Sequence, residues 1–466
     1  MISGLKPYPD YVESGLPWLG EVPSHWGTER AKWLFNKMNR IVRPEDDIVT
    51  CFRDGVVTLR RKRRVSGFTE ALHEHGYQGI RRGDLVIHAM DAFAGAIGVS
   101  DSDGKGTPVY AVCQPKAGVN AHYYAFILRE MSRRRWILAL SRGIRERSTD
   151  FRYEMFGTQR IPLPPPDEQT AIVRFLDYVN GRLEKAIRAK RKVIGLLNEQ
   201  KQAIIHRAVT RGLDPNVRLK DSGIPWLGEI PEHWGVHALK QLVMRMDYGT
   251  SENSRGKGRV RVLTMGHIRD GKILLPSFGS LSEVPPGLLL ETNDLLFNRT
   301  NSPDLVGKVG LFAGQPSDEV TFASYLVRLR ARPEHSPHWL NFLLNSIQFW
   351  GYARSQALVS LHQANLNSTR YGQMMLPTPP KIEEEGIVKH IVTECDGIER
   401  CSRRTHREIA LLSEFRTRLI ADVVTGKLDV REAAGTLPDE LTKDIDGRNS
   451  SVSGDEDLED EEADET

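Results

Sequence analysis

Apolar residues recur with the period of an α-helix along two long stretches of the chain. In each stretch they form one stripe, with steps of four and three residues, and the second stripe repeats the first 215 positions later. The stripes are Leu183, Ile187, Ile194, Leu197, Ile204 and Ala208, and then Ile398, Ile409, Leu412, Leu419 and Val423. This spacing predicts two long helices that pack against each other in antiparallel orientation. A homodimeric coiled coil is the alternative, but two matched stripes in one chain favour an internal pair.

Polar residues interrupt the two stripes at equivalent places. Lys190 and Thr405 occupy one such place, and Lys201 and Arg416 occupy the next. Such interruptions either fix the register of a helix pair, at some cost in stability, or lie at the edge of the stripe with the charge reaching solvent. For each single residue the sequence favours the second interpretation.

Each predicted helix begins after a proline pair that is followed by acidic residues. Residues 161–165 read IPLPP and residues 376–380 read LPTPP, and Glu168 and Glu383 follow shortly after. Proline blocks a helix from extending backwards, and the helix dipole favours a carboxylate in the first turn. The first long helix is therefore predicted over residues 168–210.

A tryptophan-rich phrase occurs twice in the chain. PWLGEVPSHWG runs from Pro17 to Gly27, and PWLGEIPEHWG runs from Pro225 to Gly235. We hypothesise that its four tryptophans attach each globular unit to the helix pair, because the phrase stands where each globular unit begins. The tryptophans are Trp18, Trp26, Trp226 and Trp234. The histidine of each phrase, His25 or His233, is interpreted as a packing or capping residue and not as a catalytic one.

Between these features the chain consists of short apolar runs separated by glycine, proline and Asp-Gly, which indicates strands and turns. One helix is expected in each globular unit, around residues 121–129 and 339–349. The predicted fold class is α+β, with two mixed α/β domains, mainly of short strands, joined by two long antiparallel helices in a pseudo-twofold arrangement. The predicted segments are a globular domain at 1–163, a helix at 164–214, a second globular domain at 215–378, a second helix at 379–432 and an acidic tail at 433–466.

The net charge of +3 hides a strong asymmetry between the body of the chain and its tail. Residues 438–466 contain 13 acidic and two basic residues, a net charge of −11, so the other residues carry +14. A basic body is typical of proteins that contact nucleic acid, although solubility alone would also explain an acidic tail. The tail has almost nothing to bury and is expected to be disordered.

Several classes of chemistry lack their motifs in this sequence. The four cysteines form no C-x-x-C pair, which argues against a zinc site or a disulfide framework. No Asn/Asp-Pro-Pro-aromatic motif for methylating amino groups and no nucleotide-binding P-loop occurs. There is also no bilayer-length apolar run and no signal-peptide pattern, so we expect a reducing, cytoplasmic setting. The sequence predicts no catalytic residue and no metal ligand.

Three features together resemble the specificity subunits of type I restriction-modification enzymes. They are the repeated tryptophan phrase, the Pro-Pro-acidic start of each long helix, and the stretch GDLVIHAMDAFAGAIGVS at residues 83–100. The resemblance covers about residues 10–430. It implies two target-recognition domains that each read one half of a bipartite double-stranded DNA target, with the helices setting the gap and docking two methylation subunits. The acidic tail is an addition to the family pattern.

The resemblance also implies that this chain is a non-catalytic part of a phage-defence complex. The complex would act as a site-specific DNA endonuclease and adenine methyltransferase, with restriction/translocase subunits as further partners. S-adenosylmethionine, ATP and magnesium are expected on the partner subunits and not on this chain, and no membrane association is expected.

Candidate DNA-binding residues come from basic and polar segments of both domains. They are Arg60, Arg61, Lys62, Arg63, Arg64, His88, Thr250, Ser251, Arg255, Lys257, Asn298 and Arg299. The run at residues 60–64 suits phosphate contacts, although a solvated loop is the alternative. Asn298 and Arg299 suit bidentate pairing with adenine and guanine. The segment at residues 360–363 is a further candidate.

Two alternative functions remain open from the sequence. The chain could be a self-contained DNA modification or restriction enzyme, which S-adenosylmethionine and DNA added to the purified chain would reveal. It could instead be a two-headed protein scaffold, which would protect no DNA in a footprint.

Overall fold

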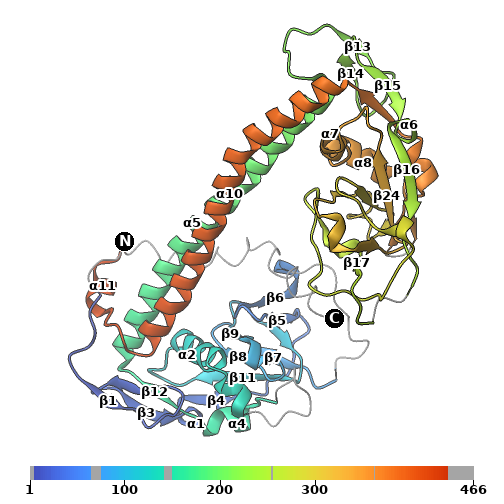
Figure 1. Cartoon of the computed structure of the whole chain (residues 1–466). Helices are drawn as coiled ribbons and strands as arrows, with labels where there is room; N and C mark the ends of the chain where they lie inside the picture. Colours follow the sequence, from blue (N-terminus) through green and yellow to red (C-terminus); the bar gives the residue numbers. More distant parts are fainter. Residues whose placement is uncertain (1–4, 64–74, 141–149, 253–255, 361–362, 439–466) are drawn as a thin grey trace. The chain divides into compact units, whose positions relative to one another are not determined.

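The computed structural model describes residues 5–63, 75–140, 150–252, 256–360 and 363–438 (Figure 1). The chain forms two compact units. Unit 1 combines residues up to 188 with residues from 409 onward, and unit 2 comprises residues 189–408. Each unit therefore contains one globular part together with one end of each long helix. The acidic segment from residue 439 onward lies outside the described residues.

The two predicted long helices are present as α5 (Pro166–Arg211) and α10 (Lys381–Val424). Ion pairs fix their relative direction within each unit. In unit 2, Lys190 Nζ lies 2.5 Å from a Glu408 carboxylate oxygen, and Lys201 Nζ lies 2.7 Å from Glu399. Because rising numbers on α5 pair with falling numbers on α10, the helices run antiparallel. In unit 1, Arg416 of α10 lies 3.8 Å from Glu184 of α5.

None of the eleven residues of the two predicted stripes is exposed. Five are buried and the other six are half-buried. The buried ones are Ile187, Ala208, Ile398, Leu419 and Val423, and the half-buried ones are Leu183, Ile194, Leu197, Ile204, Ile409 and Leu412. Thr405 is also buried and donates its hydroxyl to the Cys401 carbonyl at 2.9 Å. Lys190 and Lys201 each end in an ion pair with the facing helix, so their charges are partnered across the seam.

Unit 1 is built around a four-stranded antiparallel sheet in the order β4-β11-β8-β9, covered by helix α2. Small two-stranded sheets (β1-β2, β3-β12, β5-β6 and β7-β10) surround it. The strands are β1 (Tyr11–Glu13), β2 (Glu21–Pro23), β3 (Gly27–Arg30), β4 (Phe35–Lys37), β5 (Val49–Cys51), β6 (Val57–Leu59), β7 (Gln78–Ile80), β8 (Leu85–His88), β9 (Ile97–Val99), β10 (Gly104–Gly106), β11 (Tyr110–Pro115) and β12 (Arg160–Leu163). The helices are α1 (Ala31–Leu34), α2 (Ala121–Arg133), α3 (Trp136–Leu140), α4 (Tyr153–Thr158) and α11 (Arg431–Gly435), with 3-10 turns η1 (Arg60–Lys62) and η2 (Ala92–Ala94).

Unit 2 contains a six-stranded sheet in the order β16-β24-β20-β22-β19-β18. A three-stranded sheet β21-β26-β25 and the pairs β13-β14, β15-β27 and β17-β23 complete it. The strands are β13 (Leu219–Asp221), β14 (Glu229–Pro231), β15 (Gly235–Ala238), β16 (Val243–Tyr248), β17 (Arg261–Leu263), β18 (Ile268–Arg269), β19 (Lys272–Ile273), β20 (Leu295–Asn298), β21 (Thr300–Asn301), β22 (Val309–Leu311), β23 (Val320–Phe322), β24 (Leu326–Ala331), β25 (Leu358–Ser360), β26 (Gln363–Asn365) and β27 (Met375–Thr378). The helices are α6 (Leu239–Leu242), α7 (Pro337–Leu344), α8 (Ile347–Ser355) and α9 (Ser368–Gly372).

The two globular parts share one frame. Strands β4, β11, β8 and β9 of unit 1 have the same order and direction as β16, β24, β20 and β22 of unit 2. In each unit the frame is followed by a strand, β12 or β27, then by the proline pair and then by the long helix. This duplication agrees with the predicted fold class.

The helix expected around residues 339–349 is two helices, α7 and α8, which meet at Asn345 and Ser346. The Asn345 amide accepts a hydrogen bond from the Val309 backbone N–H (3.1 Å) and donates one to the Val309 carbonyl (3.0 Å). The side chain thus acts as one more peptide group beside strand β22. This tie to the sheet explains why one predicted helix is interrupted.

Both ends of the described chain contribute to unit 1. The Asp429 backbone N–H donates to the Lys6 carbonyl at 2.8 Å, and the Tyr11 hydroxyl donates to the Lys427 carbonyl at 3.2 Å. In unit 2 the equivalent passage is continuous, because the chain runs from α5 directly into β13. The same joint is therefore closed by hydrogen bonds in one unit and by the covalent chain in the other.

Candidate nucleic-acid interface

The repeated tryptophan phrase binds the first turn of the long helix in unit 1. Glu168 of α5 accepts a hydrogen bond from Trp26 Nε1 at 3.0 Å and one from the Tyr8 hydroxyl, and its second oxygen lies 2.9 Å from His25 Nε2. The Glu168 side chain is 2% exposed. A carboxylate buried to this degree requires such partners, because an unpaired buried charge is costly.

The second copy of the phrase repeats this arrangement on α10. Glu383 accepts a hydrogen bond from Trp234 Nε1 at 2.9 Å, and its other oxygen lies 2.7 Å from His233 Nε2. The Glu383 side chain is 37% exposed, and the structure gives it no contact equivalent to that of Tyr8 within the described residues. Each histidine is thus a partner of the glutamate in the first turn of a long helix.

Each of these tryptophans also touches the end of the other long helix. Gly426 follows α10, and a Cβ placed on it would lie 3.0 Å from the Trp26 ring. Gly212 follows α5, and a Cβ there would lie 3.2 Å from the Trp234 ring. Both glycines have positive φ, +77° and +71°, as expected where a helix ends in the left-handed conformation. Each tryptophan therefore joins the start of one long helix to the end of the other.

The first tryptophan of each phrase contacts the globular part instead. The Trp18 carbonyl accepts a hydrogen bond from Arg134, just beyond α2, at 2.8 Å. Trp226 packs on Phe349 and Tyr352 of α8, with ring centroids 5.3 and 6.2 Å apart. Within each phrase, the second tryptophan thus contacts the helix pair and the first contacts the globular part.

A second duplicated contact orients the domain helix. Gln169 of α5 accepts a hydrogen bond from the backbone N–H of Asn120, the N-cap of α2, at 2.9 Å. Glu384 of α10 accepts one from the backbone N–H of Ser336, the N-cap of α7, at 2.5 Å. Sequence patterns alone do not indicate these contacts, because their partners are far apart along the chain.

The basic run of unit 1 forms η1 directly after strand β6. The Arg61 side chain is 73% exposed and lies 3.2 Å from an Asp47 carboxylate oxygen. Lys62 donates to the Ser102 hydroxyl at 2.9 Å and lies 3.5 Å from Asp101. Arg60 donates to the Thr50 hydroxyl at 3.3 Å. Arg61 and Lys62 therefore carry the accessible charge of this run.

Arg63 and His88 are placed differently from Arg61. Arg63 is only 11% exposed, where it stacks over Phe52 at 4.4 Å and pairs with Asp54 at 2.7 Å. His88 ends strand β8 and packs against Tyr110, with ring centroids 5.1 Å apart. Burial lowers the pKa of His88, which keeps the ring neutral near pH 7. Arg64, like Arg255 of unit 2, lies outside the described residues.

The polar loop of unit 2 is only partly accessible. Ser251 and Lys257 are exposed, whereas Thr250 is 8% exposed. The Thr250 backbone bonds both Phe322 and Ser324 at 2.8 Å. The Thr250 backbone thus holds the start of the loop against residues 322–324 of the same unit.

Asn298 and Arg299 differ sharply in exposure. Asn298 ends β20 and is 2% exposed, so its amide offers no group to a base in this conformation. Arg299 is half-buried, and its guanidinium lies over the Tyr248 ring at 5.0 Å. Its backbone N–H donates to the Tyr325 carbonyl at 3.0 Å. The structure therefore places Arg299 beside Tyr248, two residues before the predicted Thr250.

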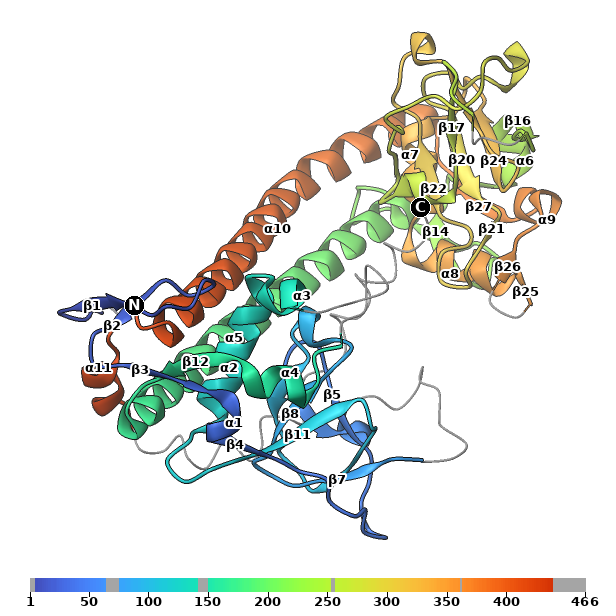
Figure 2. The ribbon, with the colours of Figure 1, turned by 90° about the horizontal axis from the view of Figure 1, so that it is seen from below.

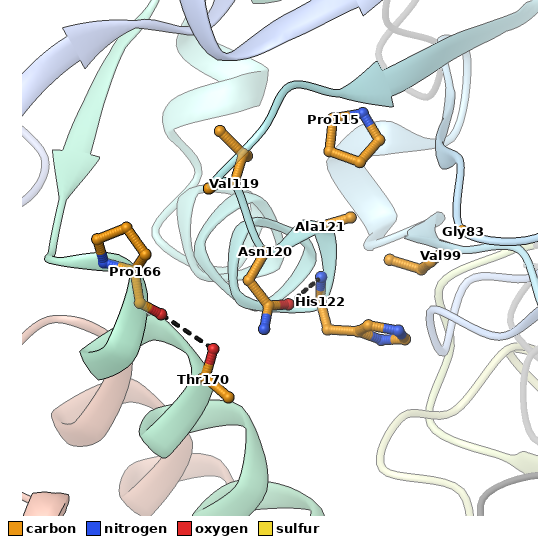
Figure 3. Close-up of a pocket in the computed structure, with 10 residues that line it drawn as sticks. Gly83, Val99, Pro115, Val119, Asn120, Ala121, His122, Pro166 and Thr170 are labelled. Carbon is orange, nitrogen blue, oxygen red and sulfur yellow. Dashed lines mark hydrogen bonds between the residues drawn. The ribbon is translucent and has the colours of Figure 1, made fainter.

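A pocket of about 420 Å³ lies in unit 1 where α2 and α5 begin (Figure 3). Asn120 accepts a hydrogen bond from the His122 backbone N–H at 3.1 Å, and Thr170 donates to the Pro166 carbonyl at 2.9 Å. Burial lowers the pKa of His122. These polar groups serve their own helices and do not converge on a common point.

Neither a metal site nor a membrane span is found in the described part of the chain. There, no three His, Cys, Asp or Glu side chains gather in a way that could hold a metal ion. None of the described helices combines the length and the apolar character needed to cross a bilayer.

The curated relatives that resemble this chain are specificity subunits of type I restriction enzymes. No family model matches the chain. A candidate specificity subunit of the type I restriction enzyme MjaX from Methanocaldococcus jannaschii is 25% identical over 177 residues, which are 37% of this chain and 41% of that protein. The type I restriction enzyme MjaVIII specificity subunit of the same organism is 24% identical over 284 residues, 60% of this chain and 64% of that protein. The matched part of this chain thus spans less than two thirds of either relative.

A solved chain from work on complex assembly and conformational transition of the type I R-M system is 16% identical, with a TM-score of 0.64. The match covers 87% of this chain and 99% of that chain, and it shows a shared fold. Duplicated domains clamped onto an antiparallel helix pair define a tandem α+β protein. In sequence the chain is similar to specificity subunits of type I restriction enzymes, and in fold it is similar to a chain of a type I R-M system.

Proposed function

We propose that this chain is the sequence-specific DNA-binding subunit of a type I restriction-modification complex. Each globular part reads one half of a bipartite target in double-stranded DNA. The helix pair sets the gap between the halves and docks two methylation subunits, which restriction/translocase subunits join. We expect the complex to act in the cytoplasm.

The duplicated clamp is the observation that carries this proposal. Trp26 with Glu168 and Trp234 with Glu383 hold two globular parts in the same way on one helix pair. Outside the shared frame the two parts differ in sequence and in strand content. One frame with two unlike surfaces is what a reader of two different half-sites requires.

Charge and side-chain chemistry support DNA as the ligand. Arg61 and Lys62 suit phosphate contacts in the first half-site, because phosphate contacts supply most of the sequence-independent affinity. Arg299 suits the second, since a guanidinium can pair in bidentate fashion with guanine. Its position over Tyr248 restricts its orientation.

In this proposal the chain itself is non-catalytic. S-adenosylmethionine, ATP and magnesium belong to the partner subunits, and this chain positions the DNA for them. The sequence supports this division, because it lacks the motifs for amino-group methylation and for nucleotide binding.

Reconstitution tests the proposal directly. The full chain with its methylation subunits should protect one bipartite, asymmetric site in a footprint, with binding that falls steeply as salt rises. The complex should methylate adenine in that site, and the chain alone with S-adenosylmethionine should not. Methyl transfer by the chain alone would establish the self-contained enzyme instead. Absence of any footprint from the complex would favour the protein scaffold.

A further inference from the structure

The three-stranded sheet of unit 2, whose strands β21, β26 and β25 are labelled in Figure 2, has a second face opposite to the one that packs on the core. Residues directly opposite in paired strands share a face, and here Thr300 pairs with Asn365, which pairs with Leu358. The neighbouring position on β26 is Ala364, which is fully buried in the core. Because successive residues of a strand point to opposite sides, Thr300, Asn365 and Leu358 form the outer face.

The outer face combines an amide with an exposed aliphatic side chain. Asn365 donates through Nδ2 to the Thr300 hydroxyl at 3.0 Å, which orients the amide. That bond uses one of its two N–H groups, and the amide keeps a carbonyl oxygen and a second N–H with which to bind a further partner. Leu358 stands directly opposite in the adjacent strand, with 68% of its surface exposed.

This pairing matches the major-groove edge of an A·T base pair. Adenine presents N7 and the N6 amino group there, which an asparagine amide recognises in bidentate fashion. The thymine of the same pair presents its C5-methyl group on the same edge, which an aliphatic side chain contacts. The major groove is wide enough to admit a two-stranded β-ribbon such as β25–β26.

The charges around the sheet suit an anionic partner. Arg299 directly precedes β21, and its carbonyl accepts a hydrogen bond from the Leu366 backbone N–H just after β26. Arg370 is exposed and donates to the Gln356 carbonyl, two residues before β25, at 2.7 Å. On one side of the ribbon Arg370 can contact a phosphate that flanks the groove, and on the other side Arg299 can reach the neighbouring base as proposed above.

We infer that the outer face of β21-β26-β25 reads an A·T pair in the second half-site, with Asn365 on the adenine and Leu358 on the thymine methyl group. The inference rests on the proposed function and assigns a base to one position of that site. Asn298, the base-reading residue predicted from sequence, is 2% exposed, and this inference assigns the contact with adenine to Asn365 instead.

Deoxyuridine tests the methyl contact, because it is thymine without that methyl group. The preferred site is first selected from a random duplex library with the complex of full chain and methylation subunits. Each thymine of the second half-site is then replaced in turn. One replacement should weaken wild-type binding about three- to fivefold, the factor that burial of one methyl group gives. Leu358→Ala should bind both duplexes equally.

Val359 provides a matched control. It is adjacent to Leu358 and 62% exposed, but it pairs with Ala364 and so belongs to the opposite face. Val359→Ala should keep the full sensitivity to deoxyuridine. Asn365→Ala should lose sensitivity to 7-deazaadenine at the partner adenine, with its folding checked by thermal melting.

The outcomes separate this inference from the proposed function. If no bipartite site is selected at all, the proposed function fails. If a site is selected but its second half contains no thymine that is sensitive to deoxyuridine, only the inference is overturned. Loss of the methyl effect in Val359→Ala but not in Leu358→Ala would also overturn it.

Discussion

Units 1 and 2 bind the first turn of a long helix with the same residue types, but the surroundings of these residues differ. In unit 1, Glu168 is 2% exposed and has three partners, including Tyr8. In unit 2, Glu383 is 37% exposed and is bound by Trp234 and His233. The additional partner in unit 1, Tyr8, belongs to the N-terminal segment, which also bonds to the segment after α10 through Lys6 and Asp429. The contacts of a tryptophan and a histidine with a glutamate are thus present in both units, while the exposure of the glutamate and its further partners differ.

The surfaces proposed to meet DNA differ much more than the clamps. After β8 the chain of unit 1 turns through η2, whereas after β20 the chain of unit 2 continues into β21 and joins a three-stranded sheet. Strands at equivalent places thus lead into unlike structures. A duplicated scaffold can therefore carry two specificities that change independently.

The largest expected effect is the loss of a clamp ring. Trp26→Ala and Trp234→Ala should each lower the free energy of unfolding by about 3–5 kcal/mol, because each removes a buried indole and leaves a cavity. Denaturant unfolding of the full chain, followed by circular dichroism, measures this. Trp33, which is 59% exposed, is the control, and Trp33→Ala should cost little. Similar stability for clamp and control variants would contradict the clamp.

Removing only the indole N–H should reveal the difference between the two units. Trp26→Phe should cost about 1–3 kcal/mol, because buried Glu168 is deprived of a donor that water cannot replace. Trp234→Phe should cost less than about 1 kcal/mol, since water can reach half-exposed Glu383. Equal effects in the same unfolding measurement would show that the additional burial in unit 1 has no energetic consequence.

Arg299→Ala should act on one half of the DNA target. Removing a base-reading side chain costs about 1–3 kcal/mol of discrimination, so the complex should tolerate base changes at one position of the second half-site. Binding to a library randomised in each half separately measures this. Relaxation in both halves would argue that the units do not read the target separately.

The basic turn of unit 1 should behave as a phosphate-binding element. Arg61→Ala combined with Lys62→Ala should weaken binding without changing the preferred bases, and should reduce the slope of log K against log salt by roughly 0.9 for each phosphate that is no longer neutralised. Titrations at several salt concentrations give the slope. Arg63→Ala is the comparison, because its partners Asp54 and Phe52 predict a decrease in stability instead. An unchanged slope in the double variant would contradict the assignment.

The smallest effect concerns the helix seam. The Lys201 ammonium group holds the pKa of Glu399 below its usual value of 4.5. This pair therefore stabilises the fold above about pH 4.5, and the contribution disappears as the pH falls through the lowered pKa. Lys201→Met should cost about 0.5 kcal/mol or less at neutral pH, and the difference should shrink in acid. A constant difference across melting curves from about pH 3 to 7 would contradict the pairing.

The long helices and the duplication could be predicted from the sequence because they depend on local patterns. Helical spacing and proline pairs act within a few turns, and the tryptophan phrase repeats almost letter for letter. The hydrogen bonds from the tryptophans of this phrase to glutamates of the long helices could not be predicted, since Trp26 and Glu168 are distant in sequence. The same holds for Asn365, whose place beside Thr300 depends on strand pairing across the domain. The prediction that Asn298 reads bases rests on its residue type alone. Residue type does not reveal that this side chain is buried at the end of β20.

The central claim is that two unlike units on one helix pair each read half of a target. Single-molecule sequencing of methylated adenines tests it most directly, in cells carrying this chain with its methylation subunits. We expect one bipartite, asymmetric motif with a fixed gap, and Arg299→Ala should relax only one of its halves. A continuous or palindromic motif, or relaxation of both halves together, would contradict the account.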